Sequence, residues 1–385
     1  MLKNIAFLMS RWPVDGGIET VTRTLANEMA ARGHHVVVLF TDKSPDKADM
    51  PFVDSRIESI LIPKDKPYEE QQAFICQSLT DRHADVVINQ CYPTWSASLL
   101  EELKGKMKIV ECMHMALFFP TRYHRLTWHG YDLKMRLCGP WVFRYIEKRQ
   151  RCETLEREFP YVDKFIFLSK SLVDEYLRFR GHRYEQGKLT YMNNPLAQNV
   201  VLTEEDFRQK ENVVLCVARM SEKEKRISLM IRLWREIERD ARFNDWRFDI
   251  VGDGPSLNDH KQLANDLGLQ RVIFHGYQNP MHYYMRSKIS LMTSVTEGWG
   301  MTIVESQQCG VVPIVLETFS SVHDLITDGE NGRIVKKERQ FLNCMKETMS
   351  ETHKREMMAK EGMRSCRKFL VGEIVDQWEA LLESI

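Results

Sequence analysis

The chain has 385 residues, of which 43% are hydrophobic and 28% charged, and its 54 basic and 54 acidic side chains give a formal net charge of zero. This length allows two domains of ordinary size, and the composition is that of a globular protein with enough apolar residues for two cores. A net charge of zero argues against a general nucleic-acid-binding protein, which would carry a strong basic excess, so we expect no nucleic-acid partner.

The N-terminal apolar run does not resemble a targeting segment. It covers only Ile5–Met9 before Ser10 and Arg11, which is too short for the core of a signal peptide. No stretch approaches the roughly 20 apolar residues that a membrane-spanning helix needs. We therefore predict a cytoplasmic protein whose membrane contact is limited to a peripheral one at the inner face of the plasma membrane.

The first elements expected along the chain are a strand, a loop, a helix and a second strand. The run Ile5–Met9 predicts a buried parallel strand, and Ser10–Gly17, with its proline and glycines, predicts a loop. Residues Ile18–Arg32 carry apolar side chains at helical spacing, and Gly33 follows as a typical helix end. With a strand at His35–Phe40, this order indicates a βαβ unit and a parallel sheet covered by helices.

A second alternation of strands and helices begins at Val213. We predict strands at Val213–Ala218, Arg247–Val251, Val272–Phe274, Ile289–Thr293 and Val311–Val315, and helices at Ile227–Glu238, near Leu257–Leu267, around Met281–Met285 and at Met301–Cys309. The polar and acidic stretch Asn194–Glu211 precedes this series and marks a boundary. The sequence therefore predicts two doubly wound α/β domains, residues 1–195 and residues 196–367.

The strongest functional signal is the segment Glu297–Glu305, in which seven residues separate two glutamates. Gly298 and Gly300 permit a close approach of the backbone to a ligand. The loop precedes a helix, whose N-terminal N–H groups favour an anion such as a diphosphate. One glutamate lies in the loop and the other in the helix, so they can hold hydroxyl groups at different ends of an extended ligand. The alternative is a pair of surface glutamates around a tight turn.

A basic segment, Arg219–Arg226, follows the first strand of the second domain. In parallel α/β sheets ligands bind beyond the C-terminal ends of the strands. Arg219 and a lysine at this position could clamp a diphosphate, the arginine through its planar fork. A solvated run of charges is the more common explanation for Lys223 and Arg226, whereas the place of Arg219 beside the strand favours binding.

Five motifs in this order resemble the large family-4 group of retaining glycosyltransferases, over nearly the whole chain. They are Pro13–Glu19, Val217–Lys225, Val251–Pro255, Glu297–Glu305 and Asp328–Gly332. The resemblance implies the GT-B fold, with two Rossmann-like doubly wound domains facing a cleft, the acceptor on the first domain and the nucleotide-sugar donor on the second. It also implies that a C-terminal helix, at about residues 368–385, crosses back onto the first domain, where Trp378 would serve packing.

The resemblance implies roles for the residues that contact the diphosphate. Gly16 and Gly17 bring backbone N–H groups close to the donor phosphates, and Arg219 and Lys225 neutralise the departing diphosphate. The spacing from the arginine to the lysine is one residue longer than usual, so Lys223 competes with Lys225 for this role. Ala218 stands where the family often has a glycine.

The resemblance also implies the residues that contact the sugars. Glu297 binds hydroxyls of the transferred sugar, Glu305 binds the ribose hydroxyls, and His114 lies near the sugar; by itself, a lone histidine is more often structural. The assignment of the donor-binding site is completed by Gly298, Trp299, Gly300, Met301, Thr302 and Lys223.

No metal or other cofactor is expected. No Asp-x-Asp stands at a strand end and no His or Cys cluster has metal-ligand spacing. The charge of the leaving group is then stabilised by Arg219 and Lys225, and catalysis depends on positioning and on stabilisation of the departing diphosphate. The resemblance implies net retention at the anomeric carbon, through attack on the same face.

The predicted function is transfer of a hexose or N-acetylhexosamine from a nucleotide-diphosphate sugar to a saccharide or lipid-linked saccharide, in the synthesis of a surface polysaccharide or glycoconjugate. Two alternatives remain open: a sugar-nucleotide epimerase of the same fold and a catalytically inactive binding subunit. The presence of Gly17, Arg219, Lys225, Glu297 and Glu305 together argues against loss of activity.

The segment Arg122–Arg151 has an unusual composition. It carries eight Arg or Lys residues against Asp132 and Glu147, with tyrosines, tryptophans and a phenylalanine between them. Such a mixture suits an anionic membrane surface or a lipid-pyrophosphate acceptor. Surface helices with their apolar stripe in the core would explain it equally well.

Overall fold

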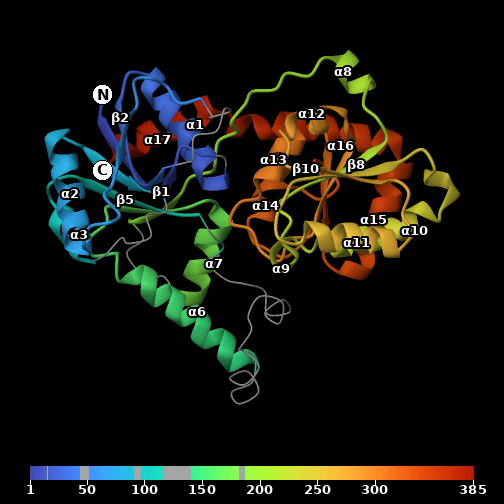
Figure 1. Cartoon of the computed structure of the whole chain (residues 1–385), viewed down its shortest axis with the longest axis horizontal. Helices are drawn as coiled ribbons and strands as arrows, with labels where there is room; N and C mark the ends of the chain where they lie inside the picture. The colour runs from blue at the N-terminus through green and yellow to red at the C-terminus, as the bar shows by residue number, and fades with distance from the viewer. Residues whose placement is uncertain (15, 44–51, 91–96, 115, 117–139, 182–186) are drawn as a thin grey trace. The chain divides into compact units, whose positions relative to one another are not determined.

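The computed structural model describes residues 1–385 except residues 15, 44–51, 91–96, 115, 117–139 and 182–186 (Figure 1). The chain divides into two compact units. The first holds most of the N-terminal half together with Phe369–Ile385, and the second holds Asn199–Lys368.

The first unit is a parallel sheet with helices. Its strands in the described part of the chain are β1 (Asn4–Trp12), β2 (His35–Lys43), β3 (Glu58–Leu61), β4 (Val86–Asn89), β5 (Lys108–Met113), β6 (Lys164–Phe167) and β7 (Leu189–Tyr191). The accompanying helices are α1 (Gly17–Ala31), α2 (Tyr68–Asp81), α3 (Ala97–Leu103), α6 (Pro140–Glu156, from Tyr145 on), α7 (Lys170–Arg180) and α17 (Val371–Glu383). The strand order is β3-β2-β1-β4-β5-β6-β7. All pairs are parallel, and the strand order reverses between β1 and β4.

The second unit has the same plan. Its described strands are β8 (Val213–Val217), β9 (Arg247–Val251), β10 (Val272–Gly276), β11 (Ile289–Met292), β12 (Val312–Leu316) and β13 (Arg333–Val335). Its helices are α8 (Glu204–Arg208), α9 (Glu222–Lys225), α10 (Ile227–Glu238), α11 (Leu257–Asp266), α12 (Met281–Arg286), α13 (Met301–Gln308), α14 (Val322–Leu325), α15 (Glu338–Ser350) and α16 (Thr352–Ser365), with 3-10 turns at Ala241–Phe243 and Cys366–Phe369. The sheet order β10-β9-β8-β11-β12-β13 is entirely parallel.

The doubly wound plan predicted for both domains is confirmed. In the second unit, α10, α11 and α15 lie on one face of the sheet and α12, α13 and α16 on the other (Figure 1). The central strands are almost continuously apolar because both of their faces are covered, and all five residues of β12 are buried. The predicted ranges Ile227–Glu238 and Arg247–Val251 match α10 and β9 at both ends.

The prediction that Ser10–Gly17 is entirely loop is wrong at its beginning. Strand β1 continues through Trp12, and Arg11 and Trp12 pair with the extended end of β2. The side chain of Trp12 is fully buried, and its Nε1 donates to Ser59 Oγ at 3.0 Å. The pairing partner and the buried indole keep the chain extended beyond the apolar run, and neither is visible in the local sequence.

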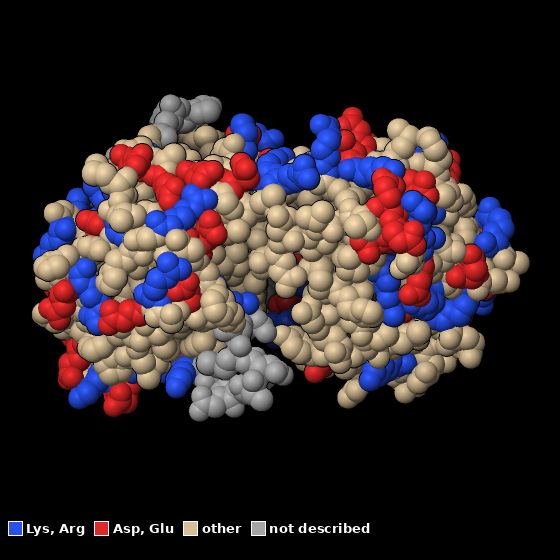
Figure 2. All heavy atoms as spheres, turned by 90° about the horizontal axis from the view of Figure 1, so that it is seen from above, with Lys and Arg blue, Asp and Glu red and all other residues tan. Residues whose placement is uncertain are grey.

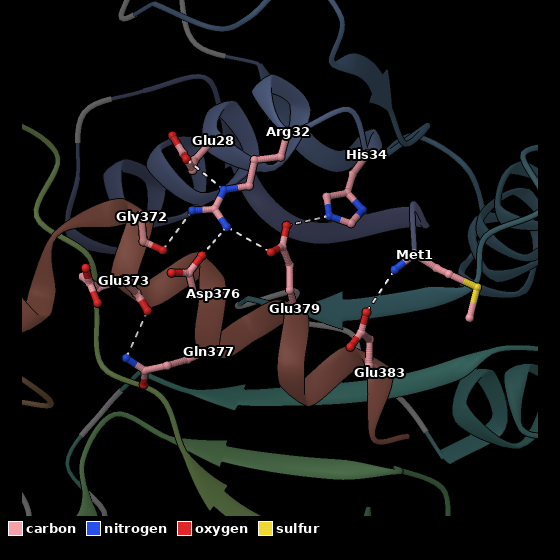
Figure 3. Close-up of polar contacts among 10 residues, drawn as sticks. All are labelled: Met1, Glu28, Arg32, His34, Gly372, Glu373, Asp376, Gln377, Glu379 and Glu383. Carbon is pink, nitrogen blue, oxygen red and sulfur yellow. Dashed lines mark hydrogen bonds and ion pairs between the residues drawn. The ribbon is translucent and has the colours of Figure 1, made fainter.

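Helix α17 packs on α1 within the first unit (Figure 3). Arg32, just after α1, donates from Nη1 to Asp376 at 2.5 Å and to Glu379 at 2.9 Å, and from Nη2 to the carbonyl of Gly372 at 3.0 Å. Its Nε donates to Glu28 at 3.0 Å. The apolar side of α17 is buried, and Trp378 is 2% exposed, which confirms its predicted packing role.

Charges of both signs are interspersed over the face of the molecule drawn in Figure 2, in keeping with the zero net charge. Among the described residues, none of the helices combines the length and the apolar composition that crossing a bilayer requires.

Candidate functional site

The loops that follow β8 and β11 meet at the point where the strand order of the second sheet reverses. Strand β8 has β9 on one side and β11 on the other. In open parallel sheets, a crevice for ligands forms at the carboxyl ends of strands at such a point. The loop after β8 carries Arg219, and the loop after β11 carries Glu297 and the glycines that precede α13.

The backbone around Arg219 is held by the turn after β9. Gly252 in that turn has φ +136°, and a Cβ at this residue would lie 1.9 Å from the carbonyl oxygen of Ala218. The N–H of Met220 donates to the carbonyl of Asp253 at 2.9 Å. The side chain of Arg219 is exposed, and among the described residues it has no hydrogen-bond or ion-pair partner. Its guanidinium is therefore available to a ligand.

Glu222 fixes the start of the short helix α9, three residues after Arg219. Its carboxylate accepts hydrogen bonds from the N–H and Oγ of Ser228, at 3.0 and 2.5 Å, and lies 2.9 Å from Nε2 of His260. Burial acts to raise the pKa of this carboxyl, but the hydrogen bonds from His260 and Ser228 prevail and the pKa lies below its usual value. Glu222 therefore remains ionised and joins α9 to α10 and α11.

The structure brings Lys225, and not Lys223, to the glutamate of the loop after β11. Thr293 Oγ1 donates to the carbonyl oxygens of Lys225 and Arg226, both at 3.0 Å. These bonds place Lys225 Nζ 2.5 Å from Glu297 Oε1, and both side chains are largely buried. Lys223 is exposed and has no such contact among the described residues.

The predicted glycine loop is shaped by its own backbone and by one serine. Gly300 has φ +97° and is the N-cap of α13, a conformation that favours glycine. Ser321 Oγ donates to the carbonyl of Gly298 at 3.0 Å. Trp299 is 2% exposed, so its side chain belongs to the core. Met301 and Thr302 lie in the first turn of α13 and are half-buried.

Glu305 lies in the second turn of α13 and faces a tyrosine of α12. The hydroxyl of Tyr284 donates to Glu305 Oε2 at 3.1 Å. Burial raises the pKa of Glu305 above its usual value, and the hydrogen bond from Tyr284 acts in the opposite direction. Sequence reasoning missed Tyr284, because no pattern along the chain links it to a helix 21 residues further on.

In the first unit, the predicted glycines lie at the start of α1, at the end of the loop that follows β1. Gly16 is the N-cap of α1 in an extended conformation, and Glu19 fills the space where its Cβ would lie. Glu19 is 8% exposed and accepts from Arg11 Nη2 at 2.8 Å. Gly17 is exposed, and a Cβ built on it would meet no atom within 4 Å. The N-terminus of α1 is therefore open at Gly17.

His114 follows β5 and contacts Gln90, which follows β4. Its Nε2 is within hydrogen-bond distance of Gln90 Oε1, and the side chain of Gln90 is 1% exposed. Burial lowers the pKa of His114 to about 4, so the ring is neutral near pH 7. Gln90 is a second residue that sequence reasoning missed.

The described part of the chain contains no cluster of three or more His, Cys, Asp or Glu side chains arranged to hold a metal ion.

Two doubly wound sheets, each with glycines and polar side chains at its switch point, define the class of two-domain nucleotide-sugar enzymes with the GT-B fold. Residues 15–196 match the model of Glycosyltransferase Family 4, and residues 202–365 match that of Glycosyl transferases group 1. The chain belongs to the family-4-type glycosyltransferases.

Two curated relatives are similar to the chain over part of their length. The chain is 29% identical over 181 residues to the lipopolysaccharide 1,6-galactosyltransferase of Salmonella typhimurium, covering 45% of this chain and 48% of that protein. It is 20% identical over 229 residues to a Campylobacter jejuni α-1,4-N-acetyl-D-galactosaminyltransferase named for an undecaprenol-diphosphate-linked saccharide, covering 59% and 62%. The chain thus spans less than two thirds of the length of either relative.

Solved structures are similar over the whole chain. Anabaena HepE in complex with UDP and glucose has a TM-score of 0.73 at 17% identity and covers 100% of both chains. The apo form of the lipopolysaccharide outer core galactosyltransferase WaaB has a TM-score of 0.68 at 18% identity and covers 99% of both. These likenesses confirm the GT-B fold.

Proposed function

We propose that this protein transfers a hexose or N-acetylhexosamine, with retention of configuration, from a nucleoside diphosphate sugar to a saccharide or lipid-linked saccharide acceptor. The product would belong to a surface polysaccharide or glycoconjugate. The observation that carries the proposal is the arrangement at the switch point of the second unit. There Arg219, whose guanidinium has no partner among the described residues, and the Lys225–Glu297 ion pair lie on adjoining loops.

Arg219, Lys225 and Glu297 suit the chemistry of sugar transfer. As the bond from the anomeric carbon to the diphosphate breaks, negative charge grows on the leaving oxygens, and donors aimed at that charge lower the barrier. Arg219 can offer two parallel N–H groups and Lys225 a compact charge. When the diphosphate draws Lys225 away, the carboxylate of Glu297 becomes free to accept hydrogen bonds from the hydroxyls of the transferred sugar.

The names of similar proteins support the classes of donor and acceptor. HepE was crystallised with UDP and glucose, which favours a uridine nucleotide and a hexose. The Salmonella relative is named for lipopolysaccharide and a Campylobacter relative for an undecaprenol-linked saccharide. We infer retention from the family resemblance, and we infer from the same residues that Arg219 and Lys225 replace a metal ion, so a chelator should leave activity unchanged.

The first experiment is a thermal-shift screen with UDP-, GDP- and ADP-linked sugars. A ligand at 100 times its dissociation constant stabilises the folded state by about 2.7 kcal/mol, which the melting temperature reports. The best donor is then incubated with lipid-linked and lipopolysaccharide-core acceptors, and nucleotide release and the anomeric configuration of the product are followed. Epimerised sugar from the donor alone would instead identify an epimerase. The absence of any stabilising nucleotide sugar would contradict the proposal.

We also propose that α6 contacts an anionic membrane surface. Residues 122–139 lie outside the described residues, but α6 exposes Tyr145 by 59% and Ile146 by 41%. Lys148 Nζ lies 5.6 Å from the ring centre of Phe179, and Arg149 pairs with Glu153 at 2.6 Å. Apolar side chains among basic ones are typical of helices that lie in a membrane interface.

Co-sedimentation with vesicles tests this membrane contact. Replacing Arg144, Lys148, Arg149 and Arg151 with glutamine should release the protein from acidic vesicles, because each basic residue at the surface contributes about 1 kcal/mol. The matched control replaces three exposed basic residues of α16, Lys354, Lys360 and Arg364, with glutamine and should keep binding. Equal sedimentation with neutral and acidic vesicles would contradict an electrostatic contact.

A further inference from the structure

We propose that Tyr284 is a positioning residue for nucleotide recognition, which holds the carboxylate of Glu305 in the orientation that accepts the ribose hydroxyls. The inference rests on the proposed binding of a nucleoside diphosphate sugar and adds a residue that does not itself touch the ligand. Tyr284 Oη donates to Glu305 Oε2 at 3.1 Å, and Tyr284 is 1% exposed.

A buried lysine holds the C-terminal end of the helix that carries Tyr284. Lys210 is 5% exposed, and its Nζ donates to the carbonyl oxygens of Tyr284, Met285 and Ser287 at 3.1, 3.0 and 2.8 Å. A lysine at the C-terminal carbonyls of a helix also opposes the negative end of its dipole. The phenol therefore stands on a fixed backbone, although α12 is only six residues long.

The packing around Tyr284 keeps its ring in one place. It belongs to an apolar cluster with Leu215, Val251, Cys309 and Val311, between α12 and the end of α13. Cys309, the residue that ends α13, follows Glu305 by four positions, so the ring lies beside the same face of the helix that carries the carboxylate. With the ring fixed, the hydroxyl reaches one oxygen of Glu305.

The direction of this hydrogen bond follows from the surroundings of both groups. Burial raises the pKa of Tyr284 well above its usual value, so the phenol keeps its proton and is the donor. Oε2 of Glu305 is the acceptor, and in the described part of the chain no group donates to Oε1. One oxygen is thus held by the protein and the other is left for a ligand, which limits rotation of the carboxylate before the ligand arrives.

Isothermal titration calorimetry with two probes tests the proposal. UDP and GDP are titrated first, and the nucleotide that binds more tightly is compared with its 2′,3′-dideoxy form, which lacks both ribose hydroxyls. The variants are Tyr284→Phe, Glu305→Ala and the matched control Tyr283→Phe. Tyr283 is the preceding residue of α12, and the centre of its ring lies 4.6 Å from that of His275. Phenylalanine keeps the ring of Tyr284, so the core remains filled.

We expect Tyr284→Phe to weaken binding of the ribonucleotide roughly tenfold, within the range for a hydrogen bond to a charged group, and to leave the dideoxy form unchanged. The ratio of the affinities for the ribonucleotide and the dideoxy form should therefore fall in Tyr284→Phe. The control Tyr283→Phe should behave like the wild type. Equal weakening of both probes would show that Tyr284 only supports the fold. The proposal would also be overturned if Tyr284→Phe left the affinity for both probes unchanged while Glu305→Ala weakened binding of the ribonucleotide.

The same experiment distinguishes failure of the proposed function. If the wild type binds neither nucleotide, or if Glu305→Ala loses no discrimination, the ribose role of Glu305 itself is wrong. Repeating the titration across pH adds a second readout. Among the described residues, the titratable groups that act on Glu305 are Tyr284 on α12 and Cys309 at the end of α13. In Tyr284→Phe, the pH below which binding of the ribonucleotide is lost should move upward, because the ionised carboxylate of Glu305 loses its hydrogen-bond donor. An unchanged midpoint of this pH dependence would contradict the positioning role.

Discussion

Two groups of charged residues in this chain use the same residue types in opposite ways. Arg32, between α1 and α17, has a partner for every nitrogen of its guanidinium: three carboxylates and a backbone carbonyl (Figure 3). Arg219, at the switch point of the second unit, has no partner among the described residues, and Lys225 there has a single one, Glu297. Arg32 uses four of the five N–H groups of its guanidinium within the protein and serves the fold. A guanidinium without such partners keeps its N–H groups for a ligand and adds little to stability.

The largest effect that tests this contrast is expected at Arg219. Arg219→Ala should lower turnover by about a hundredfold or more, as the loss of a donor aimed at developing charge typically does. The midpoint of urea unfolding should not change, because the side chain is exposed and makes no hydrogen bond or ion pair with the described residues. Steady-state kinetics and denaturant unfolding measure the two quantities. A destabilised but fully active variant would place Arg219 with Arg32 as a structural residue.

A comparable loss is expected at Lys225 and not at Lys223. Lys225→Ala should reduce turnover by about a hundredfold, since it removes the cation that can move from Glu297 to the diphosphate. Lys223→Ala is the matched control, two residues away on the same short helix, exposed, and expected to keep full turnover. The reverse pattern would show that Lys223 contacts the diphosphate.

At Arg32 the effect should appear in stability and not in catalysis. Arg32→Met leaves Asp376 and Glu379 of α17 and Glu28 of α1 without their common cation, which should cost about 1–2 kcal/mol of unfolding free energy. Nucleotide affinity should be unchanged, because the nucleotide site is proposed for the other unit. The control Arg56→Met breaks a solvent-exposed pair with Asp54 and should leave urea unfolding unaltered. A loss of nucleotide affinity without a loss of stability would reverse the contrast.

An effect of similar size, confined to one range of pH, concerns Glu158 of the first unit, whose pKa is set by burial and not by an ion pair. Burial raises its pKa from 4.5 to about 7, so the folded state keeps a proton that the unfolded state has released. Stability should therefore fall as pH rises from 4.5 through 7, and Glu158→Gln should remove about 1–2 kcal/mol of that fall. Urea unfolding at pH 5 and pH 8 measures it. The control is Glu153→Gln, at a carboxyl whose pKa is lowered by its hydrogen bond with Arg149. This variant should not gain unfolding free energy relative to the wild type at pH 8.

Much of the fold could be predicted because its signals are local. The apolar runs of the second unit gave strands and helices within one or two residues of those observed, from β8 to β12. Gly300 before α13 and Gly33 after α1 stand where the backbone takes positive φ. Each of these features depends on neighbours along the chain, so a single sequence contains it. The extension of β1 through Trp12 could not be predicted, because it depends on pairing with β2 and on burial beside β3.

The sequence by itself determined the two doubly wound units, the glycine loops and the candidates Arg219, Lys223, Lys225, Glu297 and Glu305. Only the tertiary structure decided which lysine meets Glu297, 72 residues further along the chain. It also decided that Trp299 is a core side chain and that Tyr284 faces Glu305. The physical reason is that secondary structure follows from the spacing of neighbours, whereas an ion pair or a buried hydrogen bond depends on which distant segments the folded sheet brings together.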